Sequence, residues 1–245
     1  MSRINGKAAL VTGANRGIGR AFVAGLLKAG AAKVYATARN PQTLDDLVKE
    51  GNGKVVALAL DVTRPDMIAE AARNADVALL VNNAGIAAFE GLISAKSSEP
   101  AREEMETNYF GLLNMVRAFA PVLARNGGGA IINLSSIAGQ VNFPALGSYS
   151  VSKAAVHSLT QGIRAELSGQ GTQVLGVYPG PVDTDMAANL PMDKTPPSAV
   201  VDNILQALEA GEESVYPDPA SQELHGGLLA DPLAVERQVG QMLPG

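Results

Sequence analysis

Short apolar runs alternate with longer segments of helical spacing along most of the chain. Continuously apolar runs are typical of strands buried on both faces of a parallel sheet, and they occupy residues 7–12, 32–38, 54–62, 76–85, 130–136 and 172–180. Segments with helical spacing lie at residues 17–30, 41–51, 64–75, 100–125 and 148–169. This alternation predicts one doubly wound α/β domain over residues 1–245, with a parallel sheet between two helical layers.

Three glycines lie in the turn between the first predicted strand and the first predicted helix. In the sequence VTGANRGIGR these are Gly13, Gly17 and Gly19. Glycines let backbone N–H groups approach a pyrophosphate closely, and the helix that follows adds its positive N-terminal end. The turn therefore favours a nucleotide site. Its G-x-x-x-G-x-G spacing differs from the usual G-x-G-x-x-G, and a purely structural turn is the alternative.

Polar residues follow directly after two other predicted strands. Asp61 ends the third apolar run, and Asn82 and Asn83 end the fourth. Ligands of such sheets bind at the carboxyl ends of the strands, so these residues support a nucleotide crevice. Each could instead have a purely structural role. Asp61 could cap the next helix, and the asparagines could form hydrogen bonds with the backbone.

The end of the second predicted strand bears on the choice of cofactor. A carboxylate at this point binds the adenosine ribose and selects NAD, but the first one after the strand is Asp45. Arg39 stands there instead, and Arg16 lies in the glycine turn. Because guanidinium groups bind a 2′-phosphate well, we expect NADP(H). NAD(H) stays possible if both arginines are ordinary surface residues.

Tyr149 and Lys153 are four residues apart in SYSVSK, and hence lie on one face of the last predicted helix. A neighbouring ammonium lowers the pKa of a phenol, which would make Tyr149 a general acid and base. Chance also produces such pairs, so their setting matters. Ser136 ends the fifth apolar run, and its hydroxyl could bind a carbonyl oxygen beside the tyrosine. Asn108 is a polar residue of low helix propensity in a mostly apolar helix.

Composition narrows the functional classes. Hydrophobic residues make up 47% of the chain and the net charge is −5, which suits a packed globular protein and argues against nucleic-acid or anionic-membrane partners. There is no cysteine, and the two histidines, His157 and His225, lack ligand spacing. We therefore expect no metal site and no thiolate or Ser-His-Asp chemistry. No apolar run suits a signal peptide or a membrane span, so we expect a soluble, cytoplasmic protein.

Taken in order, these motifs resemble those of the short-chain dehydrogenase/reductase family. The matching sequences are TGANRGIG, DV at Asp61, NNAG, Asn108, Ser136, YSVSK and PGPVDT, spread from Lys7 to about Pro219. The resemblance implies a Rossmann-type parallel sheet of seven strands in the order 3-2-1-4-5-6-7. It also implies reversible hydride transfer between a nicotinamide and a carbonyl or alcohol.

The resemblance also assigns roles to single residues. Tyr149 would be the acid/base, Lys153 would lower its pKa and bind the ribose, and Ser136 would donate to the substrate oxygen. Asn108 would anchor a water relay behind the lysine. Expected cofactor contacts are Gly13, Asn15, Arg16, Gly17, Ile18, Gly19, Arg39, Asp61, Val62, Asn83, Ala84, Gly85, Tyr149, Lys153, Pro179, Gly180, Val182 and Thr184. Expected substrate contacts are Ser136, Gln140, Phe143, Tyr149 and Met186.

The C-terminal part departs from the family pattern. A tail at about residues 218–245 takes the place of the V-D-G-G segment of many members. Residues 186–197 are expected to form a substrate loop. Met186, Leu190 and Met192 there favour an apolar carbonyl or alcohol substrate, unless they pack against the core. Apolar surface on the last two predicted helices, together with the resemblance, predicts a homodimer or homotetramer.

Two other functions fit part of the sequence. Nucleotide-sugar epimerases and dehydratases have a related fold, but usually a larger C-terminal domain and a different glycine spacing. A catalytically silent NADP(H)-binding sensor would have no need of a matched Ser-Tyr-Lys set. The working hypothesis is NADP(H)-dependent reduction of a ketone or aldehyde, with an NAD-dependent alcohol dehydrogenase as the alternative.

Overall fold

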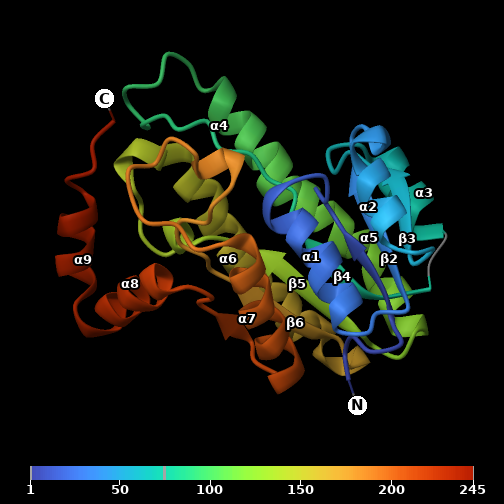
Figure 1. Ribbon diagram of the computed structural model, residues 1–245. Coiled ribbons are helices and arrows are strands. Elements are labelled where there is room, and N and C mark those ends of the chain that lie inside the picture. The colour runs from blue at the N-terminus through green and yellow to red at the C-terminus, as the bar shows by residue number, and fades with distance from the viewer. Residues whose placement is uncertain (1, 74–75, 245) are drawn as a thin grey trace.

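The computed structural model describes residues 2–73 and 76–244, and its strands form one parallel sheet (Figure 1). The strands are β1 (Ala8–Val11), β2 (Lys33–Ala38), β3 (Val55–Ala59), β4 (Val77–Asn82), β5 (Ala130–Leu134), β6 (Gln173–Val177) and β7 (Ser214–Val215). Their order is β3-β2-β1-β4-β5-β6-β7. The expected order is thus confirmed, and each of the six apolar runs contains one strand.

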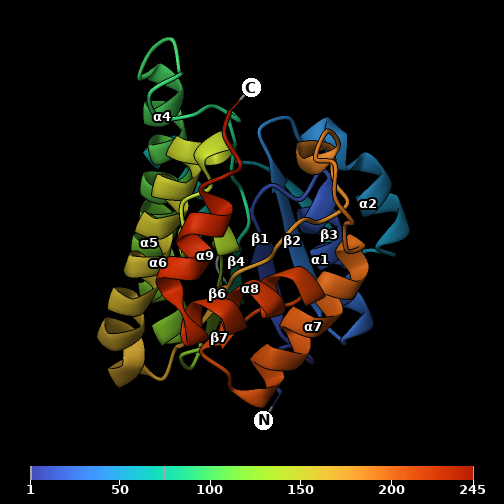
Figure 2. The same cartoon turned by 90° about the vertical axis from the view of Figure 1, so that its left-hand side faces the viewer.

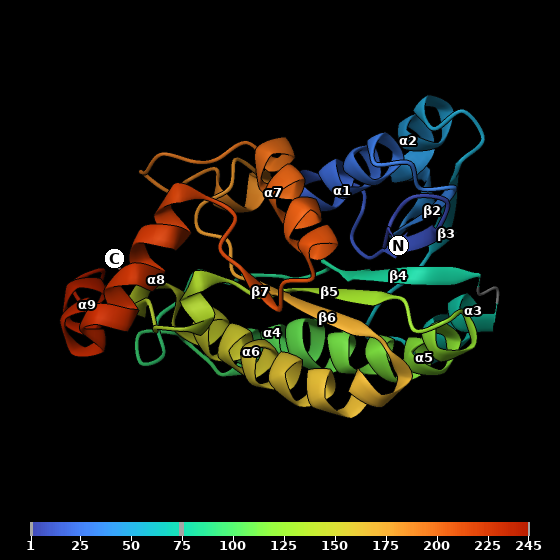
Figure 3. The same cartoon turned by 90° about the horizontal axis from the view of Figure 1, so that it is seen from below.

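Helices cover both faces of the sheet (Figure 3). They are α1 (Gly17–Lys28), α2 (Asp45–Glu50), α3 (Pro65–Arg73), α4 (Glu99–Glu104), α5 (Leu112–Arg125), α6 (Gly147–Leu167), α7 (Pro197–Ala210), α8 (Pro219–Ala230) and α9 (Pro232–Val239). α1, α2 and α7 lie on one face, and α3 to α6 on the other. Leu80 and Val81 are consecutive on β4 but belong to the two different cores. Both faces of the strand are therefore buried, which explains the continuous apolar runs.

The helix expected over residues 100–125 is not uniformly α-helical. α4 ends at Glu104, a π-helical segment spans Met105–Gly111, and α5 begins at Leu112. A Cβ on Gly111 would lie 2.7 Å from a methyl carbon of Val62, so this segment packs closely against the end of β3. π-helical turns are frequent at functional sites, and this one contains Asn108.

Three helices were not predicted. α7 begins at Pro197, the last residue of the expected substrate loop, and α8 and α9 form the tail. Figure 2 shows the tail helices between α6 and α7 at the β7 edge of the sheet. The helix expected over residues 64–75 ends at Arg73, and residues 74–75 lie outside the described residues. Within the described part of the chain, every helix falls short of what a membrane span requires in length and hydrophobicity.

Candidate active site

The turn between β1 and α1 has the shape that a bound phosphate requires. Gly13 and Gly17 have positive φ angles of 64° and 53°, which favour glycine. A Cβ on Gly19 would lie 2.1 Å from the carbonyl oxygen of Gly13, so a side chain is excluded there as well. Arg16 does not cap α1 with its side chain, and the first turn has no acidic residue. The N–H groups at this helix end can therefore bind an anion such as a pyrophosphate.

Thr12 and Asn83 hold the glycine turn against the end of β4. Thr12 Oγ1 accepts hydrogen bonds from the backbone N–H groups of Asn83 (2.9 Å) and Ala84 (3.0 Å). Asn83 Nδ2 donates to the carbonyl oxygens of Thr12 (2.9 Å) and Gly13 (3.2 Å). The Asn83 side chain, expected to contact the cofactor, thus binds the backbone of the glycine turn instead. This is the alternative, a hydrogen-bond partner of the backbone, that the sequence left open for this asparagine.

Other expected contacts also use their side chains within the protein. Asp61 Oδ1 accepts from the backbone N–H and the hydroxyl of Thr63, at 2.9 and 2.8 Å, which leaves its second oxygen for a ligand. Val62 is 7% exposed and lies in the core, and Ile18 packs against the other core. The buried Val62 can therefore reach a cofactor through its backbone, while the half-buried Ile18 keeps part of its side chain accessible.

Arg39 and Arg16 have guanidinium groups that could bind a phosphate. Arg39 follows β2 directly, is exposed, and forms no ion pair among the described residues. Arg16 lies 3.3 Å from Asp185 Oδ2, but both side chains are largely exposed, so this pair contributes little stability. Asn15, between the first two glycines of the turn, is half-buried.

Ser136, Tyr149 and Lys153 come together at the carboxyl end of β5. Lys153 Nζ lies 5.6 Å from the centre of the Tyr149 ring and donates to the carbonyl oxygen of Leu134 at 2.8 Å. The Ser136 hydroxyl is close enough to that of Tyr149 to lower the pKa of the phenol. Two hydroxyls and one ammonium therefore share one point of the sheet edge. A carbonyl oxygen bound there could accept two hydrogen bonds and one proton.

The pKa of Tyr149 differs from the expectation. Burial raises it to about 12, the nearby Ser136 hydroxyl lowers it, and the charge of Glu104 raises it. Lys153 does not offset the burial, and burial lowers the pKa of Lys153 itself to about 8. The expectation that Lys153 lowers the pKa of Tyr149 therefore stays a prediction, since burial dominates the pKa values of both groups in the free protein. The ammonium is hydrogen-bonded to the carbonyl oxygen of Leu134, and burial of the phenol disfavours the phenolate.

Asn108 joins the segment after β4 to the catalytic helix. Its side chain is 1% exposed. Oδ1 accepts from the backbone N–H of Ile86 (2.8 Å), and Nδ2 donates to the Ile86 carbonyl (3.0 Å) and to Ser152 Oγ (2.9 Å). A Cβ on Gly85 would lie 3.0 Å from Asn108 Oδ1 and 3.6 Å from Lys153 Nζ, so Asn108 lies close behind the lysine. The protein occupies both N–H groups of this amide and one lone pair of its oxygen, so the second lone pair and the backbone remain for a water relay.

The loop after β6 lies against both the glycine turn and the catalytic serine. The Pro179 carbonyl accepts from Ser136 Oγ at 3.4 Å. A Cβ on Gly17 would lie 3.0 Å from Thr184 Cγ2. Val182 is buried in the core. The loop thus spans the distance between the phosphate end and the catalytic end of the crevice.

The tail holds two of the predicted site residues. The backbone N–H of Gly180 donates to Asp218 Oδ2 at 2.8 Å. Gln140 Nε2 donates to the Tyr216 hydroxyl at 2.6 Å, and Gln140 Oε1 lies 3.3 Å from His225 Nδ1. The His225 and Tyr216 rings are stacked with their centroids 3.7 Å apart. Gln140, expected to contact the substrate, therefore has a side chain fixed by Tyr216, just before the tail, and by His225 in α8.

The remaining predicted substrate residues are partly open to solvent. Phe143 is half-buried and precedes α6, while Met186 is 39% exposed and Met192 42% exposed. The two methionines therefore do not pack fully into the core. Thr195 closes this loop by pairing with Val182 in a β-bridge.

Sequence reasoning missed five residues that shape the site. Each is polar, but its neighbours along the chain do not single it out. The structure brings them to the site from the end of β1, the end of α4 and the tail: they are Thr12, Glu104, Tyr216, Asp218 and His225. Only the i, i+4 spacing of Glu104 from Asn108 could have drawn attention to one of them. Within residues 2–73 and 76–244, no cluster of three or more histidine, aspartate or glutamate residues could hold a metal ion.

Comparison with known proteins identifies the family. The family described as short chain dehydrogenase matches residues 7–195. An uncharacterized oxidoreductase, YusZ, of Bacillus subtilis is 34% identical over 192 residues, which cover 75% of this chain and 68% of that protein. An NADP-dependent 3-hydroxy acid dehydrogenase of Schizosaccharomyces pombe is 30% identical over 93% of this chain and 96% of its own.

A solved structure agrees over nearly the whole chain. It is a short chain dehydrogenase from Burkholderia cenocepacia in complex with NADP, 44% identical, with a TM-score of 0.92 over 98% of this chain and 99% of its own. This likeness extends through the tail, beyond the residues that the family match covers. The protein is therefore an oxidoreductase that belongs to the short-chain dehydrogenase/reductase family.

Proposed function

We propose that the protein reduces a ketone or aldehyde to the alcohol with NADPH, in a reversible reaction. The observation that carries this proposal is the proximity of the Ser136 and Tyr149 hydroxyls, with Lys153 beside them. These three side chains lie at the carboxyl edge of the parallel sheet. At the same edge, the glycine turn between β1 and α1 suits the binding of a dinucleotide.

NADP(H) is the cofactor that the residues fit best. The exposed Arg39 stands where an NAD-selecting carboxylate would be, and Arg16 is held only by a weak surface pair. The relative from Burkholderia cenocepacia was solved with NADP. Gly13, Gly17 and the N-terminus of α1 would hold the diphosphate. Thr184 and the Pro179–Gly180 turn would border the nicotinamide.

The bound cofactor supplies the hydride for the carbonyl carbon. The chain supplies hydrogen bonds and a proton at the carbonyl oxygen. Ser136 and Tyr149 would both donate hydrogen bonds to this oxygen, and Tyr149 would transfer its phenolic proton as the alkoxide develops. One hydride and one proton together convert the carbonyl to the alcohol. The Lys153 ammonium stabilises the phenolate left behind, and in the direction of oxidation Tyr149 takes the proton back.

The substrate pocket is proposed to lie between the catalytic serine loop, the tail and residues 186–197. Gln140, Phe143 and Met186 would line it, and the exposed methionines of the loop suit an apolar substrate. The groove between α5 and α6 carries apolar residues such as Leu113 and Leu159. We propose that this groove forms the interface of a homodimer or homotetramer.

The test is turnover of purified protein with NADPH and a panel of ketones and aldehydes, followed at the nicotinamide absorbance. At least one substrate should be reduced, and Tyr149→Phe should lower kcat by about 100-fold or more while it still binds NADPH. Failure to reduce any member, or full activity of Tyr149→Phe, would favour the silent sensor. A clear preference for NADH would favour the NAD-dependent alternative.

A further inference from the structure

The half-buried side chain of Gln140 is held at both polar atoms of its amide. Nε2 donates to the Tyr216 hydroxyl at 2.6 Å, and Oε1 lies 3.3 Å from His225 Nδ1. The two partner rings are stacked on each other, with an angle of 14° between their planes. Tyr216 stacks in turn on Tyr178, which directly follows β6 and is only 1% exposed. The amide is therefore fixed in one orientation by rings that are anchored in the sheet. This pair, Tyr216 and His225, is termed the Gln140 clamp.

Gln140 ends the short 3₁₀-helix that begins directly after Ser136. This helix spans Ile137–Gly139, and its N-cap is Ser136, whose Oγ accepts from the backbone N–H of Ala138 at 3.1 Å. At the other end, the backbone N–H of Gln140 donates to the carbonyl oxygen of Ile137 at 2.9 Å. The Ser136 hydroxyl and the Gln140 amide thus lie at the two ends of one hydrogen-bonded turn. Because a single turn is too short to absorb a displacement, movement of one end displaces the other.

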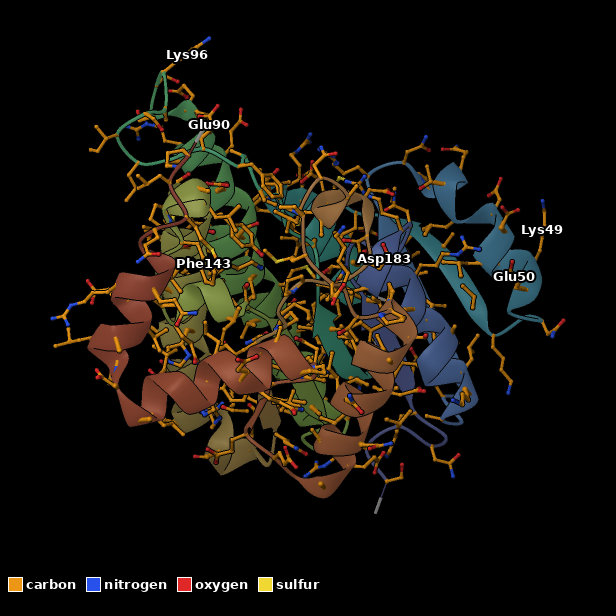
Figure 4. All side chains as sticks on the ribbon, turned by 60° about the vertical axis from the view of Figure 1, so that its left-hand side comes forward. Lys49, Glu50, Glu90, Lys96, Phe143 and Asp183 are labelled. Atoms are coloured by element: carbon orange, nitrogen blue, oxygen red, sulfur yellow. The ribbon has the colours of Figure 1, made fainter. Side chains whose placement is uncertain are left out.

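This turn is packed between the catalytic helix and the tail. A Cβ on Gly139 would lie 2.6 Å from the backbone carbonyl carbon and oxygen of Lys153, so the turn is in direct contact with the backbone of α6. α8 packs against the turn from the side of the tail. Further along the same loop, the backbone N–H of Ala145 donates to the carbonyl oxygen of Met242 at 3.0 Å. Figure 4 shows Phe143, which lies between these two points of contact, beside the C-terminal helices. The loop after the catalytic serine therefore has the tail as its support.

We propose that Tyr216 and His225 are positioning residues for the reaction, which act through the amide of Gln140. By fixing this amide, they hold the Ser136 hydroxyl in its place beside Tyr149. A hydrogen-bond donor stabilises a developing oxyanion only if it is in place before the reaction, and a small displacement of such a group lowers the rate strongly. Release of the Gln140 clamp should therefore lower kcat and leave cofactor binding at the glycine turn intact. This inference rests on the proposed carbonyl reduction.

Three substitutions of similar shape release the clamp. Tyr216→Phe removes the hydroxyl and keeps the stacked ring, His225→Phe removes Nδ1 and keeps a ring, and Gln140→Met removes both amide contacts at similar length. The double variant Tyr216→Phe/His225→Phe should lower kcat for carbonyl reduction by about 10-fold, with an unchanged KM for NADPH. In the Gln140→Met background, the same two substitutions should cause no further loss of kcat, because the amide that transmits their effect is already absent.

Tyr35→Phe is the matched control for the loss of a tyrosine hydroxyl. The Tyr35 hydroxyl lies 2.8 Å from Asp76 Oδ1, but it belongs to β2, which β1 and β4 separate from β5. This variant should have the kcat of the wild type. If the double variant does not fold, Tyr216→Phe alone is compared in the wild-type and Gln140→Met backgrounds. A folded clamp variant with the kcat of the wild type overturns the inference, and so does an equal loss of kcat in both backgrounds.

The outcome can be separated from that of the proposed function. If the wild type reduces no carbonyl, the proposed function fails, and the clamp is then tested by amide hydrogen exchange followed by NMR. The backbone N–H groups of Ala138 and Gly139 donate to Ser136 Oγ and to the Ser136 carbonyl oxygen. Both should exchange about 10-fold faster in the clamp variant than in the wild type, whereas the glycine turn at residues 13–19 should keep its exchange rates. Unchanged exchange of Ala138 and Gly139 in a folded clamp variant overturns the inference.

Discussion

The backbone N–H of Gly180 donates a hydrogen bond of 2.8 Å to the carboxylate of Asp218, a residue that is only 1% exposed. The same carboxylate caps α8 by accepting from the backbone N–H of Ser221 at 2.9 Å. One side chain therefore ties the first turn of the tail to the Pro179–Gly180 turn. This contact gives the unusual tail a direct connection to the nicotinamide end of the proposed site.

Asp218→Ala should weaken both the fold and cofactor binding. The variant loses a charge-assisted hydrogen bond and a helix cap, so we expect the free energy of unfolding to fall by about 3 kcal/mol. Because Gly180 is then free to move, the KM for NADPH should rise by about ten-fold or more. Urea unfolding and steady-state kinetics measure the two effects.

Asp231→Ala is the matched control for Asp218→Ala. Asp231 caps α9 through the backbone N–H of Ala234 at 3.0 Å, but it does not contact the loop after β6. We expect a stability loss of about 1 kcal/mol and no change in KM. An equal rise of KM in both variants would mean that the tail affects the cofactor only through its overall stability.

Burial of Lys153 makes stability depend on pH in the alkaline range. Its pKa is lowered from 10.5 to about 8, so between these values the unfolded chain binds a proton that the native protein lacks. The free energy of unfolding is therefore highest above pH 10.5, where Lys153 is neutral in both states. It falls as the pH is lowered towards about 8, because the unfolded chain takes up the proton first. The free energy of unfolding of the wild type relative to Lys153→Met should rise by about 3 kcal/mol over this range. Urea unfolding at several pH values measures it.

Two variants isolate this effect. Lys54→Met removes an exposed lysine and should show no such rise. Tyr149 acts in the opposite direction at higher pH, since its pKa is raised from 10.0 to about 12. Stability due to the protonated tyrosine is lost as the pH rises from 10 towards 12, and Tyr149→Phe should remove that loss. A difference between wild type and Lys153→Met that stays constant from pH 8 to 10 would contradict the prediction.

Much of the fold could be predicted from the sequence because both faces of the strands are buried. The apolar runs located six strands, and the resemblance supplied their order. The two-residue strand β7 (Ser214–Val215) is too short to give a pattern of its own. The π-helical segment around Asn108 depends on the packing of Gly111 against Val62, a contact between residues far apart in the sequence.

The site was predicted less completely for a related reason. Ser136, Tyr149 and Lys153 are close enough in sequence to suggest a common site, and the structure brings them together. Glu104 and Asp218 act through contacts with Ala88 and Gly180, which no local pattern shows. The sign of the Tyr149 pKa shift was missed because it depends on burial, and burial is a property of the assembled fold.

Arg39 should decide the preference for NADPH over NADH. Loss of a guanidinium–phosphate interaction is worth about 1.5–3 kcal/mol, so Arg39→Ala should raise the KM for NADPH by roughly 10- to 100-fold. The KM for NADH should change little, because NADH lacks the 2′-phosphate. Arg237→Ala, on the exposed face of α9, controls for the loss of one positive charge. Equal effects on both cofactors would show that Arg39 does not bind this phosphate.

Gly162 tests the proposed subunit interface. It lies exposed in the middle of α6, at the edge of the α5–α6 groove, and a Cβ there would meet no atom within 4 Å. Since glycine costs a helix about 1 kcal/mol relative to alanine, close approach of a second subunit would explain its presence. Gly162→Arg fits the isolated chain but would clash with such a partner. It should therefore lower the molar mass in size-exclusion chromatography with light scattering, from a dimer to a monomer or from a tetramer to a dimer. Gly226→Arg is the matched control, because Gly226 is equally exposed within α8 and its Cβ would also meet open space. It should leave the molar mass unchanged. If Gly162→Arg has the molar mass of the wild type, subunits do not associate through this groove.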